Sequence, residues 1–223
     1  MNSTRQTDDD VPAIERHSVA SQVYSSLRSR ILSGKFPQGE RVVEAAIAKS
    51  LGVSRAPVRE AVNRLTEAGL LENRTHFGPS VVHMDMDKIR QLYAVRNAIE
   101  ALAIRAVALK HTAADIRKLR EFIDVMTVHA RAGDLRGLSD AELDFHEALW
   151  QMAGNQYVEK VASLLFDHLR LALTIDNAGY DSLVDVAREH EALIDAIEAG
   201  DPDRASEVLT IHIMASLEGR SSK

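Results

Sequence analysis

The sequence predicts a mostly α-helical protein in two parts, a small N-terminal domain that ends in a hairpin and a larger all-helical C-terminal domain. The composition supports this class, because only 4% of the 223 residues are aromatic while alanine, leucine, glutamate and arginine abound. Apolar residues recur at helical spacing along most of the chain. The pattern changes after Met84, so we place the boundary between the two parts near residues 82–86.

Charge divides the chain in the same way. The formal net charge of −6 by itself argues against nucleic-acid binding. Residues 11–82, however, carry ten basic and six acidic side chains, whereas residues 83–223 carry sixteen basic and twenty-four acidic ones. Such an asymmetry hints at separate partners for the two parts. We expect a polar, mobile tail over residues 1–12, one domain over 13–83 and a second over 84–220.

The composition also excludes several classes of protein. There is no cysteine, so neither a disulfide framework nor a thiolate metal site can form. No apolar run approaches the roughly 20 residues of a membrane span. The polar start MNSTRQTDDD does not have the pattern of a signal peptide. We therefore expect a soluble, cytoplasmic protein that does not interact with a membrane.

Three helices and two strands are expected in the N-terminal part. Val23, Leu27 and Ile31 recur at helical spacing, and glycines stand where the second and third helices end. A Phe-Gly-Pro turn then separates two short strands. The expected elements are helices over residues 19–32, 44–51 and 55–68, and strands near 70–75 and 80–83.

The third helix begins with GVSRAPVREAV, residues 52–62, which fixes two arginines at its start. Ser54 is a favourable N-cap, and Pro57 falls in the first turn, where the amide it lacks would have no intrahelical partner. Arg55 and Arg59 are four residues apart, so they share one face at the positive end of the helix dipole. This arrangement suits an anion, and DNA phosphates and guanine edges are the usual users.

Helix, glycine-containing turn and arginine-led helix form a helix-turn-helix pattern, and the hairpin makes it a winged one. The alternative is a surface helix with ordinary solvated arginines. Cap, turn, wing and local positive charge together favour operator DNA, read by two subunits on a palindrome. The candidate DNA-binding residues are Ser54, Arg55, Arg59, Arg74, His76 and Gly78.

The C-terminal part reads as six helices. The breaks between them carry turn or capping residues such as Gly133, Gly154 and Gly200. The expected helices cover residues 85–110, 112–132, 136–153, 156–176, 181–199 and 202–219.

Three histidines lie on the apolar faces of three different helices: His146, His190 and His212. One such histidine is usually a hydrogen-bonded core residue. Burying three imidazoles without partners is costly, whereas a divalent metal uses all three as neutral ligands. Glu142 stands one turn before His146 and can reach the same ion. Spacing alone leaves both readings open.

Arg96 falls on the inward stripe of its helix, and a buried guanidinium needs an anion. Glu100, four residues on, can supply that anion. Alternatively, Arg96 grips the carboxylate of a small effector through two hydrogen bonds. Asn155 is a candidate for a further polar contact with the effector, or it is only a helix C-cap.

The segment VVEAAIAKSLGVSRAPVREAVNRLTEAGLL closely resembles the winged helix-turn-helix of GntR-family bacterial transcription regulators. The resemblance implies that Arg55 and Arg59 read the operator and that the wing tip around Phe77 and Gly78 enters the minor groove. Some members have an operator-contacting arginine where this chain has Ala45, so that contact is not implied here.

Three further segments, AELDFHEALWQMAGN, EHEALIDAIEAGD and LTIHI, resemble the FCD-type ligand-binding domain of the FadR subfamily. The resemblance implies a divalent metal, with zinc as first choice and nickel or manganese as alternatives. His146, His190 and His212 would hold it, with Glu142 where the family usually has aspartate. It also implies a small organic acid that touches the metal.

Together these features predict a homodimeric transcription regulator, a repressor rather than an enzyme, whose operator binding responds to a small carboxylate metabolite. Two alternatives remain. A metal-dependent hydrolase on the helical bundle would lack an obvious general base. A regulator that responds to a fatty-acyl effector, as in the subfamily's namesake, fits the three polar histidines less well.

Overall fold

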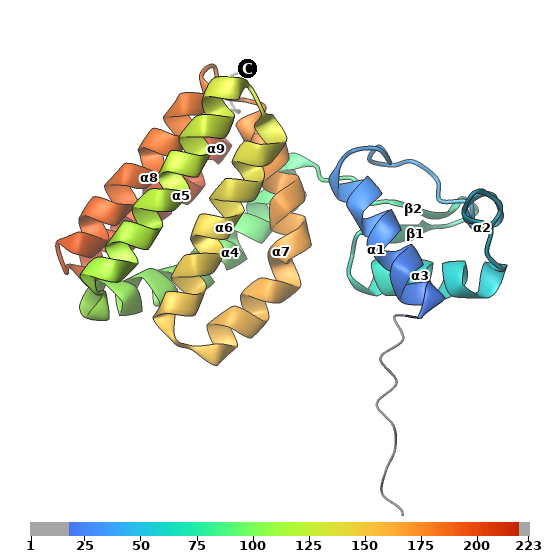
Figure 1. Cartoon of the computed structure of the whole chain (residues 1–223), viewed down its shortest axis with the longest axis horizontal. Coiled ribbons are helices and arrows are strands. Elements are labelled where there is room, and N and C mark those ends of the chain that lie inside the picture. Colours follow the sequence, from blue (N-terminus) through green and yellow to red (C-terminus); the bar gives the residue numbers. More distant parts are fainter. Residues whose placement is uncertain (1–17, 219–223) are drawn as a thin grey trace, which may run out of the picture.

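The computed structural model describes residues 18–218, except for the side chains of Ser216 and Glu218. The tail predicted for residues 1–12 lies outside this range. Within it, nine helices and one two-stranded sheet form two domains, as the mostly helical prediction requires (Figure 1). None of the described helices combines the length and the apolar character that crossing a membrane requires.

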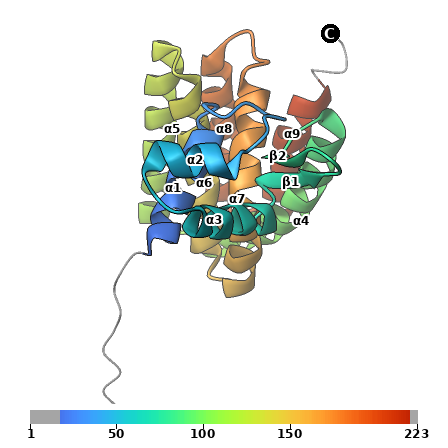
Figure 2. The ribbon, with the colours of Figure 1, turned by 90° about the vertical axis from the view of Figure 1, so that its right-hand side faces the viewer.

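The N-terminal domain packs three helices against a hairpin. Figure 2 looks onto this domain and shows α3 with α2 above it and the hairpin beside it. Val58, Ala61 and Leu65 of α3 are completely buried, so the helix face opposite its arginines forms the core. The elements are α1 (Val19–Leu32), α2 (Glu44–Leu51), α3 (Arg55–Glu67), β1 (Leu71–Arg74) and β2 (Gly78–Val81).

The hairpin turn differs from the predicted one. Strands β1 and β2 pair antiparallel, and Arg74 lies opposite Gly78. The predicted Phe-Gly-Pro turn is therefore wrong, because Gly78 and Pro79 already belong to β2. Residues 75–77 make the turn. His76 adopts a left-handed φ of 63°, and the amide of Phe77 donates to the carbonyl of Arg74 at 3.0 Å.

The C-terminal domain is a bundle of six helices whose ends lie within two residues of the predicted ones. Local capping explains the agreement. Thr112 and Asp115 form a capping box at the start of α5, and Gly133 and Gly154 end α5 and α6 in the left-handed conformation. The helices are α4 (Met86–Lys110), α5 (Ala113–Ala132), α6 (Leu135–Ala153), α7 (Gln156–Asn177), α8 (Leu183–Glu198) and α9 (Pro202–Glu218).

Helix α4 is the central element of the bundle, since it packs against α6, α7, α8 and α9. It runs antiparallel to α7. At one end the hydroxyl of Tyr93 donates to Asp176 at 2.5 Å, and at the other Lys110 donates to the carbonyl of Ala153 at 2.6 Å, just before α7 begins. Together these two contacts determine which residues of α4 lie opposite which residues of α7.

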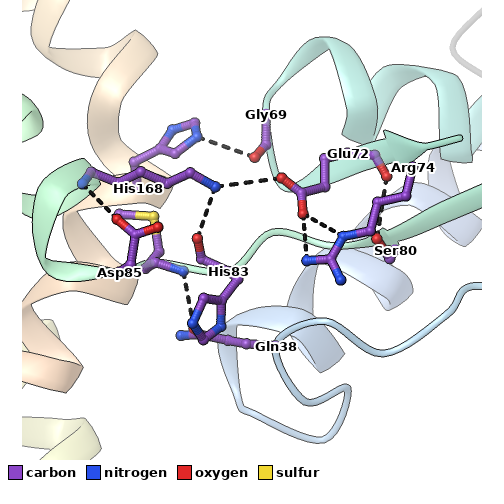
Figure 3. A network of polar contacts seen from close by, with 10 residues as sticks. Gln38, Gly69, Glu72, Arg74, Ser80, His83, Asp85 and His168 are labelled. Atoms are coloured by element: carbon purple, nitrogen blue, oxygen red, sulfur yellow. Dashed lines mark hydrogen bonds and ion pairs between the residues drawn. The ribbon is translucent and has the colours of Figure 1, made fainter.

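The N-terminal domain sits against α7. The guanidinium of Arg28, on α1, binds the carboxylate of Asp167 through Nε at 2.7 Å and through a second hydrogen bond. One residue further along α7, Nε2 of His168 lies 3.2 Å from the carbonyl oxygen of Gly69 (Figure 3). Two neighbouring α7 residues therefore touch both the C-terminal half of α1 and the loop before the wing.

The segment that joins the domains is also held by polar contacts. The amide of Met84 donates to Gln38 at 3.0 Å, and the ammonium of Lys88 donates to the carbonyl of His83 at 2.9 Å. The same ammonium lies 3.4 Å from the carboxylate of Glu72 on β1. The connection between the domains is thus fastened to the base of the wing.

Candidate nucleic-acid interface and metal centre

The arginines of α3 project into solvent. Ser54 occupies the N-cap position with extended backbone angles, but its hydroxyl makes no capping hydrogen bond. Arg59 is exposed and its Nε lies 3.4 Å from Glu44 of α2. Arg55 is also exposed, and no ion pair involves it in the described part of the chain. Both guanidinium groups are therefore accessible at the start of a rigid helix.

The wing carries a third arginine that is already engaged. Nε and Nη2 of Arg74 both bind Glu72, at 2.9 and 2.7 Å. These bonds lower the pKa of the Glu72 carboxyl. His76 is exposed at the turn, and Gly78 has a φ of 85°, a conformation that other residues rarely adopt. A Cβ at Gly78 would meet no atom within 4 Å, so the backbone geometry, rather than lack of space, requires glycine.

Four predicted metal ligands meet inside the helical domain. Glu142 and His146 come from α6, His190 from α8 and His212 from α9. One ligand atom from each of the four lies within 4.8 Å of the corresponding atoms of the others. Glu142, His146 and His190 are buried and His212 is partly buried. Three helices thus converge on one polar point in an otherwise apolar core.

The three imidazoles are in the buried, uncharged state in which histidine can bind a metal. Nδ1 of His190 lies 2.7 Å from the carbonyl of Val186, which places the ring proton on Nδ1 and the lone pair on Nε2. Within residues 18–218, Nε2 of His190, Nδ1 of His212 and both ring nitrogens of His146 lack a hydrogen-bond partner. Burial lowers the pKa of all three rings. Buried nitrogens without partners fit a divalent metal.

Glu142 completes the donor set. The amide of Asn177 donates to its Oε2 at 2.7 Å, which leaves the other oxygen for a ligand. Burial raises the pKa of Glu142 to about 7, against the opposing effects of Arg96 and Asn177. A cation bound next to Glu142 would stabilise its ionised form, which burial disfavours.

Arg96 is buried beside the cluster and forms the expected pair with Glu100, with Nε 2.8 Å from Oε1. The other oxygen of Glu100 lies 2.8 Å from Nδ1 of His146, although poorly aligned for a hydrogen bond. Burial opposes ionisation of Glu100, but Arg96 and His146 outweigh it and lower its pKa to about 2. Nη2 of Arg96 has no hydrogen-bond partner among the described residues.

A small cavity of about 10 Å³ lies next to Arg96 and the cluster. That volume holds about one water molecule. Two phenols near it are bound to carboxylates: Tyr93 donates to Asp176 at 2.5 Å, and Tyr180 donates to Glu189 at 3.0 Å. The lining residues are Tyr93, Arg96, Glu142, Leu173, Asp176, Asn177, Tyr180, His212 and Ile213.

One predicted site residue lies elsewhere. Asn155 is exposed at the N-cap of α7, where its Oδ1 accepts from the amide of Tyr157 at 3.0 Å. Asn177, which contacts Glu142, lies at the other end of this 22-residue helix, roughly 30 Å away. Asn155 is therefore neither beside the cluster nor a C-cap. The amide that reaches the site is that of Asn177, one residue beyond the helix expected over 156–176.

Comparison with known sequences matches both domains. Residues 19–81 match the gntR family of bacterial regulatory proteins, and residues 91–215 match the FCD domain. The chain is 34% identical over 205 residues to a probable D-xylose utilization operon transcriptional repressor of Paenarthrobacter nicotinovorans, covering 92% of this chain and 89% of that protein. It is 27% identical over 202 residues to the transcriptional repressor RspR of Escherichia coli, covering 87% and 86%.

Solved structures share the fold. A putative GntR transcriptional regulator from Rhodococcus aligns with a TM-score of 0.76 and 23% identity, over 92% of this chain and 98% of that one. McbR/YncC of E. coli aligns with a TM-score of 0.71 and 18% identity, over 92% and 99%. With sequence matches across both domains, the chain belongs to the gntR family of bacterial regulatory proteins, carries an FCD domain, and is a transcriptional regulator.

Proposed function

We propose that the protein is a homodimeric repressor whose binding to a palindromic operator is modulated by a small carboxylate metabolite held beside a divalent metal. The observation that carries the effector proposal is Arg96. Its buried Nη2 lacks a partner within the described chain and lines the same cavity as Glu142 and His212. A carboxylate placed there would satisfy the guanidinium and lie next to the metal.

Glu142, His146, His190 and His212 are the residues that would hold the metal. Three neutral imidazoles and one carboxylate suit zinc, with nickel and manganese as alternatives. When bound, the ion would supply positive charge for an anionic ligand. The chain itself supplies the orientation, because Val186 fixes the ring of His190 and Asn177 fixes Glu142.

The lining of the cavity supports a hydroxylated monocarboxylate as the effector. Asp176 lines the cavity, and Glu189 accepts a hydrogen bond from Tyr180, which also lines it. Carboxylates accept hydrogen bonds from hydroxyl groups but repel a second carboxylate. The D-xylose utilization repressor that this chain resembles is also named for sugar metabolism, which fits a sugar-derived acid.

On the DNA side, Arg55 and Arg59 would read base edges in the major groove, and Arg74, His76 and the backbone at Gly78 would contact the groove beside it. Ser54, whose hydroxyl makes no capping bond, would contact a phosphate. Repression is the proposed sense, because relatives are named as repressors.

Thermal unfolding of the zinc-loaded protein tests the effector site. Gluconate should raise the melting temperature, because a ligand of the folded state stabilises it by mass action. Hexanoate, which lacks hydroxyls, and citrate, which has three carboxylates, should raise it much less. Arg96→Lys keeps a positive charge beside Glu100 but should lose most of the gluconate response.

Equal shifts for all three acids, or an unchanged response in Arg96→Lys, would remove the cavity as the effector site. Incubation of the zinc-loaded protein with p-nitrophenyl acetate, which has the hydrolysable ester bond that the three acids lack, distinguishes a regulator from a hydrolase. A regulator should release p-nitrophenol no faster than free zinc does, and faster release would favour the enzyme alternative.

A further inference from the structure

A groove lies between α6 and α7, separate from the metal cluster. It encloses about 330 Å³, a volume within the usual range of small-molecule sites. Only Gly154 and Asn155 join the two helices, which therefore run antiparallel and form the two walls (Figure 1). The groove shares no lining residue with the cavity beside Arg96. We call it the α6/α7 groove. Its lining includes Glu147 and Trp150 of α6, with Glu159, Lys160 and Phe166 of α7.

Two aromatic rings line the groove, one from each wall. Trp150 is only 3% exposed, and Phe166 is partly buried, so packing holds both rings in place. A cation is attracted to the face of an aromatic ring, and most strongly to that of tryptophan. The apolar edges of the same rings suit a hydrocarbon chain. The aromatic lining therefore favours a ligand that combines positive charge with methylene groups.

The two carboxylates of the groove have no partner within the described residues. Neither Glu147 nor Glu159 forms an ion pair or a hydrogen bond there, and Glu147 is partly buried. A carboxylate that is partly removed from water is stabilised by a nearby cation. The groove thus offers two unused acceptors of positive charge.

The cations next to these carboxylates are already engaged elsewhere. The ammonium of Lys160 lies 5.5 Å from the centre of the Tyr157 ring, which is outside the groove lining. The guanidinium of Arg170 lies 5.6 Å from the centre of the Phe166 ring, and its Nε lies 3.3 Å from Asp140 of α6. Neither cation neutralises Glu147 or Glu159, so the groove presents more negative than positive charge.

The two carboxylates belong to the same stretch of the groove, on opposite walls. Glu147 stands seven residues before Gly154, and Glu159 stands five residues after it. In two antiparallel helices, this difference of two residues places them within roughly 3 Å of the same level. Packed helix axes are roughly 8–10 Å apart, so a short chain with a charge at each end can bridge the groove.

We propose that the α6/α7 groove binds a small aliphatic diamine in its doubly protonated form. One ammonium pairs with Glu147 and the other with Glu159, while the methylene chain lies against Trp150 and Phe166. A ligand with one ammonium leaves one carboxylate unpaired. An anionic ligand meets two carboxylates and no free cation, so the metabolite proposed for the metal cavity does not suit this groove.

The groove adjoins the contact between the two domains. Phe166 lines it, and the next residue, Asp167, binds Arg28 of the N-terminal domain. A diamine in the groove is therefore a second small-molecule ligand, with the opposite charge and its own position on α7. The inference does not depend on the metal or on the carboxylate effector.

Tryptophan fluorescence tests the groove directly, because Trp150 is the only tryptophan of the chain. Cadaverine, titrated into the full-length protein at constant ionic strength, should change the emission in a saturable way. Pentylamine has the same carbon chain but one ammonium. It should bind several-fold more weakly, because one exposed ion pair is worth up to roughly a factor of five. A metal chelator should leave the cadaverine titration unchanged.

Glu147→Gln combined with Glu159→Gln should weaken cadaverine binding more than tenfold, measured by fluorescence and by calorimetry. Glu121→Gln combined with Asp124→Asn is the matched control, because it changes the net charge equally at exposed positions of α5. The control should bind cadaverine as wild type does. Circular dichroism should show both double variants folded, since neither substitution removes a partner within the described residues.

Three results with the wild type would overturn this assignment: no saturable change in emission, equal affinity for pentylamine and cadaverine, or loss of binding with the chelator. Wild-type affinity in the glutamine pair would do the same. Equal weakening in the α5 control would show general attraction to an acidic protein instead of a site. Failure of the gluconate assay would leave these titrations unaffected, so the two proposals can fail separately.

Discussion

Glu142 is a buried carboxyl whose surroundings favour its neutral form when no cation is bound beside it. Burial raises its pKa to about 7, and nearby Arg96 only partly offsets that effect. In the unfolded chain the same group has a pKa near 4.5. Between pH 4.5 and 7 the folded state therefore holds a proton that the unfolded state has released. Without metal, this residue destabilises the fold increasingly as the pH rises through that window.

Glu142→Gln should remove that destabilisation. Relative to wild type, the metal-free variant should be equally stable below pH 4.5 and more stable by up to about 3 kcal/mol above pH 7, because one pKa unit corresponds to about 1.4 kcal/mol. Urea unfolding at pH 5 and pH 8, with a chelator present, measures the difference. A gain of the same size at both pH values would contradict the assignment of the pKa.

The same variant should behave in the opposite way toward metal. A neutral amide is a poorer ligand than a carboxylate, so zinc affinity should fall at least tenfold, measured by competition with a chromogenic chelator. Asp140→Asn, at a partly exposed position of the same helix, is the control and should keep wild-type affinity.

The helical spacing of the sequence predicted part of this site and missed the rest for a physical reason. His146, His190 and His212 each lie on an apolar helix face, and Arg96 and Glu100 are four residues apart, so local periodicity placed them inward. Asn177 is 35 residues from its partner Glu142. Such contacts depend on how helices pack, which periodicity does not specify.

At the scale of single elements, α3 is a short helix whose first turn is rigid. Pro57 restricts the first turn, and the buried face of the helix holds it against the hairpin, so Arg59 projects from a fixed position. The contact between Arg59 and Glu44 is long and exposed, so it is worth little and breaks easily. We expect Arg59 to leave Glu44 for DNA.

Arg59→Ala should abolish specific binding to an operator selected from a random duplex library. Loss of one bidentate contact to guanine costs about 1–3 kcal/mol per half-site, and a symmetric dimer has two half-sites. Fluorescence anisotropy at a fixed salt concentration measures the loss. Arg131→Ala, an exposed arginine on α5, should bind like wild type, and equal affinity of both variants would exclude Arg59 from the readout.

Helices were easier to predict than the hairpin. Caps and breaks such as the Thr112–Asp115 box lie within a few residues of one another, so the sequence records helix ends locally. The wing turn depends on His76 entering the left-handed region, which few residues other than glycine adopt. The prediction therefore assigned the turn to the glycine and proline that follow.

At the scale of the whole molecule, α7 connects the two candidate sites. Its last residues, Asp176 and Asn177, line the cavity, and Asn177 donates a hydrogen bond to Glu142. Near its middle, Asp167 and His168 hold the N-terminal domain. The relative placement of the two domains was beyond sequence analysis, because Arg28 and Asp167 are 139 residues apart and their pairing follows only from the tertiary fold.

Asp167→Asn should weaken the link between effector and DNA without removing either binding site. The ion pair with Arg28 is lost, so a shift of α7 would no longer be passed fully to the N-terminal domain. We expect gluconate to change operator affinity several-fold less than in wild type, measured by anisotropy with and without the acid. Asp124→Asn, at an exposed position of α5, should respond as wild type does. An undiminished response would show that coupling follows another route.

The cavity beside Arg96 holds about one water molecule, far less than any organic acid occupies. On the proposed assignment, a metabolite can enter this cavity only when helices of the bundle move apart. The rate of effector binding is then set by the frequency of that opening rather than by diffusion. A regulator whose binding site opens only at intervals averages over brief rises in effector concentration. The cell's response would then follow sustained supply of the nutrient and ignore passing fluctuations.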